Sequence, residues 1–217
     1  MKVKFIVRIL LISSAYSIST DCPNMINLAR GLGMITQQPA IWNQLQIDCC
    51  TSSGVICVSQ SVTQIIWNNT NLNGFINATA LPSGLQKLYL YGNQIYGSIP
   101  RTWPSTLQNL YLNYNLLTGA IPIIWPSGLK KLDLGSNQLN GTIPGSWPAG
   151  LQLLRLYNNQ FTGGIPSSWP TVLQTLDLHI NFFNGTISSS WPSGLQDLRF
   201  NWQYFISTID ISCFKSW

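Results

Sequence analysis

A 22-residue repeat constrains the fold of this chain more than any other feature of its sequence. The chain contains five uninterrupted copies of this repeat, each of which begins at a leucine. They are close to the pattern L-x-x-L-x-L-x-x-N-x-x-x-G-x-I-P-x-x-W-P. The spaced leucines are Leu85, Leu107, Leu129, Leu151, Leu173 and Leu195. A chain that repeats at a fixed period of this length stacks its copies into a solenoid. We therefore predict one elongated domain in which each copy forms one turn of a coil.

The copies at the two ends diverge from this pattern. A looser copy begins at Val62, and a decayed one runs from Leu195 to Trp217. End units of a solenoid must cover its core instead of continuing it, so such divergence is expected. We place a cysteine-rich N-terminal cap at residues 20–61, the repeats at 62–194, and a degenerate last repeat or C-terminal cap at 195–217.

The first part of each repeat predicts a short strand with one buried face. Its leucines alternate with polar residues, and strands of successive turns would pair as a parallel sheet. Outward positions then align in columns on the face that we expect to be concave. There, Tyr89, Tyr91 and Tyr111, with Tyr114, would cluster at one end as interface anchors. We predict that the ligand-binding residues are Lys87, Tyr89, Tyr91, Tyr111, Asn113, Lys131, Asp133, Arg155, Tyr157, Asp177, His179 and Arg199.

An asparagine stands at the ninth position of each regular repeat, where the chain leaves the strand. Backbone donors and acceptors need partners at such a buried turn, and an amide side chain can supply both kinds. We predict a structural ladder of Asn93, Asn115, Asn137, Asn159 and Asn181. The glycine four positions later suits a bend that a side chain would obstruct.

A Trp-Pro pair marks the return segment of every regular repeat. A residue before proline is pushed out of the α region, which predicts extended or 3₁₀ segments on the convex side. The tryptophans are Trp103, Trp125, Trp147, Trp169 and Trp191. Their ladder is compatible with an aromatic strip that binds carbohydrate, but its fixed place in the repeat favours packing in the core.

The N-terminus predicts a secretory signal at residues 1–19, with cleavage near 17–19. Basic Lys2 and Lys4 precede an apolar stretch and then small residues. Without Lys2, Lys4 and Arg8 the chain carries 8 basic and 6 acidic side chains, so its charge gives no reason to expect a nucleic-acid partner. No later apolar run approaches the roughly 18 residues that a membrane span needs, so we predict no transmembrane segment beyond the signal. We expect a secreted protein, extracellular or in a cell wall.

Five cysteines indicate an oxidising compartment. Four of them precede the regular repeats, the full set being Cys22, Cys49, Cys50, Cys57 and Cys213. Adjacent cysteines with no histidine nearby argue against a metal site, and we predict neither a metal nor a cofactor.

Between the first two cysteines, apolar residues recur at helical spacing, and Pro23 stands where a helix would begin. These residues are Met25, Leu28, Leu32 and Ile35. They predict one short helix, held by disulfide bonds, over the N-terminal end of the core.

The cap and the repeat together resemble those of plant-type extracellular leucine-rich-repeat proteins, which include polygalacturonase-inhibiting proteins and receptor-kinase ectodomains. The resemblance rests on Cys22, Trp42, Asp48-Cys49-Cys50, Gly54-Val55-Ile56-Cys57 and the repeat motif N-x-L-x-G-x-I-P. It implies a leucine-rich-repeat solenoid, a right-handed coil or horseshoe with its parallel sheet on the concave face. It also implies disulfide bonds Cys22–Cys49 and Cys50–Cys57 and recognition of a partner through that face.

Some features depart from that family. The repeat is shorter than the family's usual unit, and Trp-Pro occupies the place of a leucine-bearing convex segment. The segment (L/W)-P-x-x-L, which joins one repeat to the next, resembles the compact repeats of some bacterial effector proteins. Cys213 stands where the family has a cysteine pair, which is compatible with a truncated gene product.

Four sequons predict N-glycosylation, at Asn68, Asn77, Asn140 and Asn184. Asn68 would lie on the concave side at the first strand, where a glycan would limit the usable face.

Catalysis has two candidate sites in the sequence. Asp133 and Asp177, two strands apart, would resemble the carboxyl pair of an inverting glycosidase. Arg155 between them would lower a carboxyl pKa that a general acid needs raised, so we predict instead an ion ladder of Asp133, Arg155, Asp177 and Arg199.

His179, the one histidine, has no nucleophile motif beside it, and we predict a pH-sensitive surface contact. We therefore expect a protein that is not an enzyme.

The function that these features favour is recognition of an extracellular protein, peptide or glycan on the concave face. An inhibitor of a secreted hydrolase is an alternative that the resemblance suggests. A structural or adhesion protein of the cell surface is another, supported by the regular Trp-Pro coil.

Overall fold

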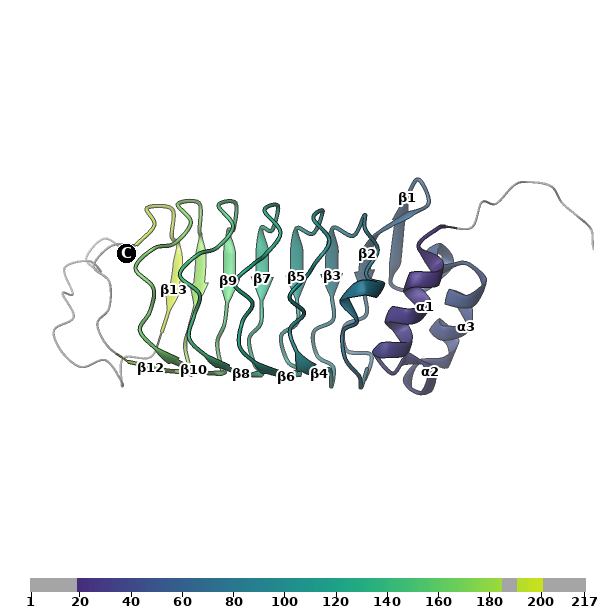
Figure 1. The fold of residues 1–217 in the computed structure, drawn as a ribbon, viewed down its shortest axis with the longest axis horizontal. Coiled ribbons are helices and arrows are strands. Elements are labelled where there is room, and N and C mark those ends of the chain that lie inside the picture. The colour runs from purple at the N-terminus through teal and green to yellow at the C-terminus, as the bar shows by residue number, and fades with distance from the viewer. Residues whose placement is uncertain (1–18, 185–190, 201–217) are drawn as a thin grey trace, which may run out of the picture.

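The computed structural model describes residues 19–184 and 191–200 (Figure 1). The predicted signal through residue 18, Gly185 and Cys213 lie outside the described residues. An elongated coil of short strands extends from a helical cap at its N-terminal end. The predicted solenoid with a parallel sheet, one strand from each turn, is confirmed.

One sheet runs the length of the coil. Only its first pair of strands, from the cap and the first repeat, is antiparallel, and every other neighbouring pair is parallel. In spatial order its strands are β1 (Val55–Val58), β2 (Ser61–Ile66), β3 (Lys87–Tyr89), β5 (Asn109–Tyr111), β7 (Lys131–Asp133), β9 (Leu153–Arg155), β11 (Thr175–Asp177) and β13 (Asp197–Arg199). The cap thus begins the sheet that the repeats continue.

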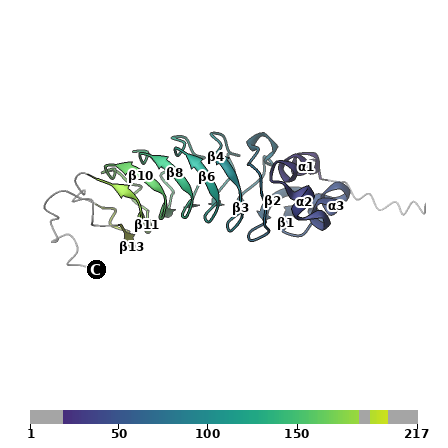
Figure 2. The same ribbon diagram turned by 90° about the horizontal axis from the view of Figure 1, so that it is seen from below.

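A second parallel sheet follows the asparagine ladder along another side of the coil (Figure 2). It contains β4 (Tyr96–Ser98), β6 (Leu116–Gly119), β8 (Gln138–Gly141), β10 (Gln160–Gly163) and β12 (Phe182–Phe183). Sequence reasoning did not predict these strands, because an alternation of four residues is too short to distinguish from a loop. Pairing with the neighbouring turns makes them strands.

The return segments contain extended residues and turns. In the described part of the chain, 3₁₀ helices occur only at η1 (Cys49–Thr51) in the cap and at η2 (Ala78–Ala80) in the first, looser repeat. The glycines that end β6, β8 and β10 adopt a left-handed conformation, with φ of 80° at both Gly119 and Gly141. A residue with a side chain is disfavoured there, which explains the glycine in the motif.

Side-chain amides complete the hydrogen bonding inside each turn. The Asn115 Oδ1 accepts a hydrogen bond from the Ile95 backbone N–H at 3.0 Å, and its Nδ2 donates to the carbonyls of Leu90 and Leu112, each at 3.0 Å. The same pattern of one accepted and two donated backbone bonds recurs at Asn137, Asn159 and Asn181. Each amide therefore joins its own turn to the preceding one.

The tryptophan ladder packs on itself. The rings of Trp103 and Trp125 lie 6.2 Å apart and nearly parallel, and those of Trp125 and Trp147 lie 6.5 Å apart. Trp125 and Trp169 are buried, and the other three tryptophans are half-buried. Stacked and largely covered rings fit the packing interpretation better than an open carbohydrate-binding strip.

The cap differs from the prediction of one helix. It contains α1 (Cys22–Gly31), α2 (Met34–Gln37) and α3 (Pro39–Ile47). Met25 and Leu28 are buried as their spacing predicts, but Ile35 is exposed. The break falls at Gly33, whose φ is 73° and where a Cβ atom would stand 2.3 Å from the Asn73 carbonyl oxygen.

Two disulfide bonds fasten the cap, Cys22–Cys49 and Cys50–Cys57, with the connectivity that the family resemblance implies. The first joins the start of α1 to η1, and the second joins η1 to β1. The cross-links hold the helices over the end of a core that would otherwise be open to water.

Removal of one ladder amide is expected to destabilise the coil. Asn115→Ala leaves the buried Ile95 N–H without its acceptor and weakens two carbonyl contacts, so we expect the free energy of unfolding to fall by about 3 kcal/mol. Chemical denaturation measures this change. Gln160→Ala, which removes an exposed amide from β10, is the matched control and should change stability by less than about 0.5 kcal/mol. Equal effects of the two substitutions would contradict the role of the ladder.

Candidate ligand-binding face

The outward side chains of the eight-stranded sheet form a continuous surface, here called the front face. It comprises the outward residues of β3 to β13 and the residue two positions after each of β3, β5, β7, β9 and β11. Parallel pairing sets Tyr89 beside Tyr111, Asp133 beside Arg155, and Asp177 beside Arg199. Lys87, Asn109 and Lys131 form a second row. A third row contains Tyr91, Asn113, Gly135, Tyr157 and His179, aligned by backbone hydrogen bonds between successive turns.

Tyr89 and Tyr111 form an aromatic pair on β3 and β5. Their ring centroids lie 5.0 Å apart, and the Asn109 Nδ2 donates to the Tyr89 hydroxyl at 3.3 Å. Partial burial raises the pKa of Tyr111 above its usual range, and the neighbouring Tyr89 makes the next largest contribution in the same direction. Tyr91 makes no ring contact with another described aromatic residue. Two of the predicted tyrosine anchors therefore form one fixed unit.

A second aromatic group lies further along the face. Tyr157 stacks on His179 with ring centroids 5.3 Å apart, and the edge of Tyr114 meets it at 6.2 Å. Tyr157 leans across Gly135, where a Cβ atom would stand 2.2 Å from its ring. Tyr114 thus belongs with Tyr157 and not with Tyr89 and Tyr111 as predicted. Gly135 was the feature of the sequence that could have revealed this group, because its missing side chain leaves room for the Tyr157 ring.

Charged residues on the front face form separate pairs, so of the predicted ion ladder only the Asp133–Arg155 contact forms among the described residues. The Arg155 Nη1 lies 3.6 Å from the Asp133 Oδ2. Arg199 turns to Asp197 of its own strand, with Nε and Oδ1 3.0 Å apart, and the His179 Nδ1 contacts the Asp177 Oδ1. For both Asp177 and Arg199, a partner in the same strand or turn is nearer than the partner across the sheet.

Burial dominates the behaviour of Asp133. Asp133 is only 2% exposed. The loss of water around its carboxyl group raises the pKa of that group above its usual value. The Gly135 N–H and Arg155 act in the opposite direction but do not outweigh it. The expectation that Arg155 would lower this pKa overall is therefore wrong. The carboxyl is still ill placed for glycosidase chemistry, because it is buried and its Oδ1 accepts from Gly135 at 3.1 Å.

The remaining polar clusters do not form a catalytic arrangement. Among the described residues, no Ser or Thr hydroxyl and no thiol makes a hydrogen bond to His179. Cys22, Asp48 and Cys49 lie close enough to share a metal ion, but the two sulfurs are bonded to each other and offer no thiolate. No helix in the described ranges combines the length and the apolar character that a bilayer crossing requires.

The turn after each of β3, β5, β7, β9 and β11 places one residue in the left-handed region. The φ values run from 51° to 69° at Gly92, Tyr114, Ser136, Asn158 and Ile180. Glycine and asparagine tolerate this conformation, but a tyrosine and especially a β-branched isoleucine do not. Tyr114 is 56% and Ile180 51% exposed, so neither gains much from burial. Both flank the Tyr157–His179 stack, a location that sequence reasoning missed for Ile180.

The predicted sequons lie on different sides of the coil. Asn140 and Asn184 are exposed on or beside the second sheet. Asn77 precedes η2, where its Oδ1 accepts from the Thr79 N–H at 3.2 Å. Asn68 follows β2 and is half-buried at the N-terminal end of the front face. Glycans at these sites remain predictions, and most of them would leave the front face open.

These features define a leucine-rich-repeat solenoid with a plant-type disulfide cap. The sequence model described as Leucine Rich Repeat matches residues 84–105, 128–149 and 150–171. No curated protein sequence matches the chain significantly.

Several solved structures are similar to this one. Pollen receptor kinase 3 shares 29% identity with a TM-score of 0.68, over 76% of this chain and 86% of that one. The Arabidopsis receptor kinase HAESA ectodomain, in complex with an IDA peptide hormone, shares 28% with a TM-score of 0.73, over 83% of this chain and 32% of that one. The Arabidopsis SOBIR1 ectodomain shares 25% with a TM-score of 0.65, over 76% and 96%. These neighbours confirm the resemblance to plant extracellular leucine-rich-repeat proteins.

A substitution that relieves the strained corner is expected to stabilise the protein. Ile180→Asn replaces a β-branched residue at a φ of 54° with one that tolerates it, so unfolding should require about 1 kcal/mol more. The reciprocal Asn158→Ile should lower stability by a similar amount. Thermal or denaturant unfolding of the two variants compares them directly. A stabilising effect of Asn158→Ile would contradict the strain.

The raised pKa of Asp133 predicts how stability depends on pH. In the window between its ordinary value of 3.8 and its higher folded value, the folded state binds more protons than the unfolded state. The contribution of Asp133 to stability is therefore lost as the pH rises through this window. The stability of Asp133→Asn relative to the unchanged protein should grow as the pH rises above about 3.8 and then level off once the folded carboxyl is ionised. Unfolding across this range tests the sign, and a shrinking difference would show that the pair with Arg155 dominates instead.

Proposed function

We propose that this chain is a secreted recognition module that binds an extended peptide, or an extended segment of a protein, along the front face. The observation that carries the proposal is the two fixed aromatic groups, Tyr89–Tyr111 and Tyr114–Tyr157–His179, half exposed on one sheet. We further propose that the protein acts by binding and not by catalysis.

The fixed rings favour a binding role because they lose little freedom when a partner arrives. Tyr157 is held by Tyr114 on one side, His179 on another and the backbone of Gly135 beneath. Aromatic side chains that are ordered before binding are effective interface anchors, since association does not have to immobilise them. Arg155 and Lys131 lie beside them on the same face and provide charged contacts.

A peptide fits this face better than a glycan. The rings of Tyr157 and His179 lie only 9° from parallel, so each covers a face of the other. Edges and polar groups remain for the partner, and these suit backbone amides and side chains. The peptide bound to the similar HAESA ectodomain supports the same choice.

The positions of the predicted glycosylation sites are compatible with binding at the front face. The exposed sequons at Asn140 and Asn184 are on the side of the second sheet. A glycan on Asn68 would limit the front face at its N-terminal end and leave the two aromatic groups accessible. The location that we propose is extracellular.

Alanine substitution of the first aromatic pair is expected to weaken binding at least tenfold, which corresponds to about 1.4 kcal/mol. The secreted, glycosylated protein is screened against secreted peptides, secreted hydrolases and cell-wall polysaccharides, and each hit is then measured with Tyr89→Ala/Tyr111→Ala and with Arg155→Gln. Gln138→Ala/Gln160→Ala, on the second sheet, is the matched control and should bind normally. Unfolding curves establish that each variant is folded.

The screen also separates the alternatives. Inhibition of a hydrolase that depends on the front face would identify an inhibitor. Retention by polysaccharide that no front-face substitution affects would favour a structural role and contradict the proposal.

A further inference from the structure

A pair of isoleucines projects from the coil on a side other than the front face. Ile123 and Ile124 are 73% and 71% exposed, more than any other large hydrophobic residue that the structure describes. The corresponding positions of the neighbouring repeats hold Arg101-Thr102, Gly145-Ser146 and Ser167-Ser168. The repeat therefore does not require apolar residues here, and the pair is a local feature of one turn.

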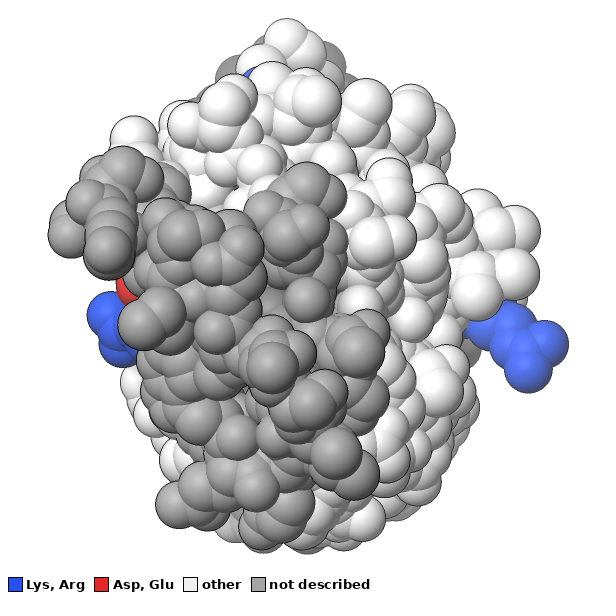
Figure 3. Space-filling model, turned by 90° about the vertical axis from the view of Figure 1, so that its left-hand side faces the viewer, with Lys and Arg blue, Asp and Glu red and all other residues white. Residues whose placement is uncertain are grey.

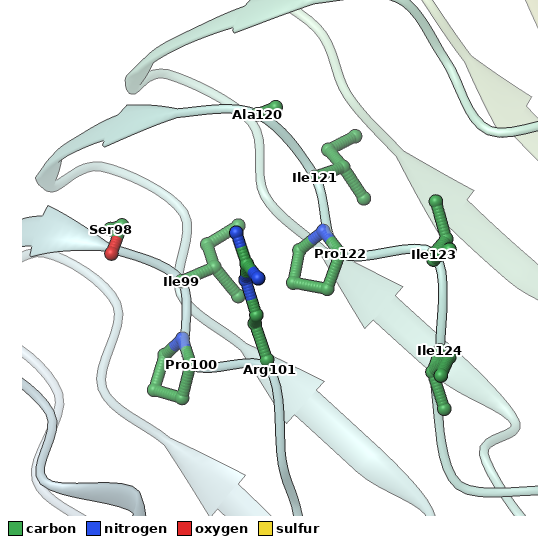
Figure 4. Close-up of a pocket in the computed structure, with 9 residues that line it drawn as sticks. All are labelled: Ser98, Ile99, Pro100, Arg101, Ala120, Ile121, Pro122, Ile123 and Ile124. Atoms are coloured by element: carbon green, nitrogen blue, oxygen red, sulfur yellow. The ribbon is translucent and has the colours of Figure 1, made fainter.

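A hollow of about 710 Å³ borders this pair (Figure 4). The buried side chains of Ile99 and Ile121 and the rings of Pro100 and Pro122 line it, just after the second-sheet strands β4 and β6. A smaller hollow of about 290 Å³ lies on the other side of the pair, toward Trp125 and Trp147. The isoleucines thus form a ridge between two depressions, and the larger one has the size of a ligand pocket.

One cation accompanies this apolar surface. The Arg101 side chain extends along the larger hollow between Ile99 and Pro122 (Figure 4). No carboxylate among the described residues lies within ion-pair distance of Arg101. In the view from the C-terminal end, few of the visible described side chains are charged (Figure 3). An exposed guanidinium beside an apolar hollow is complementary to a group that is both apolar and anionic.

A second copy of this chain offers no such group in its described part. Asp133, Asp177 and Asp197 are each engaged by a basic partner. Asp21 accepts from the Val62 N–H and Asp48 from the Cys50 N–H. These five aspartates are all the acidic residues that the structure describes, so charge complementarity favours a partner protein over the described part of a second copy.

We propose that the ridge and the larger hollow form a second binding site, for a segment of a partner protein that presents leucine-like side chains next to an aspartate or glutamate. The apolar side chains cover Ile123 and Ile124 and enter the hollow between Pro100 and Pro122. The carboxylate pairs with Arg101. This site is separate from the front face and does not depend on what binds there.

Isoleucine-methyl NMR of the secreted, disulfide-bonded protein tests the site. The probe is the peptide acetyl-Leu-Asp-Leu-Leu-amide, and its matched control is the same peptide with asparagine in place of aspartate. We expect saturable shifts at Ile99, Ile121, Ile123 and Ile124. The dissociation constant of the asparagine peptide should be at least five times higher than that of the aspartate peptide. Shifts centred on other isoleucines, or equal affinity for the two peptides, would overturn the proposal.

Two variants assign the contacts. Ile123→Ser/Ile124→Ser copies the serines of a neighbouring repeat and should abolish the shifts at Ile99 and Ile121. Arg101→Gln should bind both peptides equally weakly. Arg155→Gln, on the front face, should leave the titration unchanged, so a failure of the front-face proposal is distinguishable from a failure of this one. Normal unfolding curves are required of all three, and unchanged peptide binding by Arg101→Gln would overturn the role of the guanidinium.

Two further measurements decide between occupants. Octanoate, an apolar carboxylate without a peptide backbone, should bind more weakly than the aspartate peptide. Equal or tighter octanoate binding would identify a site for lipid-like acids and overturn the peptide assignment. Sedimentation should show a monomer, because dimerisation that Ile123→Ser/Ile124→Ser abolishes would make a second copy the occupant.

Discussion

The bonds from the asparagine side chains to the backbone are the interaction on which the rest of this structure depends. Each turn leaves its strand inside the core, where unpaired N–H and carbonyl groups are unfavourable. Asn115 supplies an acceptor and a donor to the preceding turn and a donor to its own turn. Because the amide can do this only when the turns are in register, the ladder also sets the alignment of both sheets and the columns of side chains on the front face.

That alignment gives the protein two surfaces with different chemistry. The front face combines fixed aromatic rings with ion pairs in which Asp133 and Asp177 are buried, so its exposed charges are mostly cationic. The ridge at Ile123 and Ile124 is apolar, and Arg101 beside it has no carboxylate partner among the described residues. A rigid coil can hold two partners at a fixed separation, since each surface is built from strands that the same ladder aligns. On the two proposals above, this geometry would join a ligand on the front face to a second protein at the ridge.

Local departures from the repeat occur where these surfaces are. Tyr114 and Ile180 occupy left-handed positions that glycine or asparagine would fill with less strain, and both are exposed beside Tyr157 and His179. Ile123 and Ile124 replace polar residues without being buried. Unfavourable residues that packing does not explain are typical of functional surfaces. In a chain whose other positions follow a strict pattern, such exceptions are easy to locate.

The sequence by itself determined the solenoid, the strand in each turn, the asparagine ladder and the columns of the front face, because these follow from a period and from hydrogen-bonding groups that every copy shares. Only the tertiary structure decided which neighbours interact. The second sheet exists through pairing between turns, Tyr157 reaches Tyr114 because Gly135 lies between them, and burial outweighs Arg155 at Asp133. Each of these depends on distances and solvent exposure across turns, and the order of residues within one repeat does not contain that information.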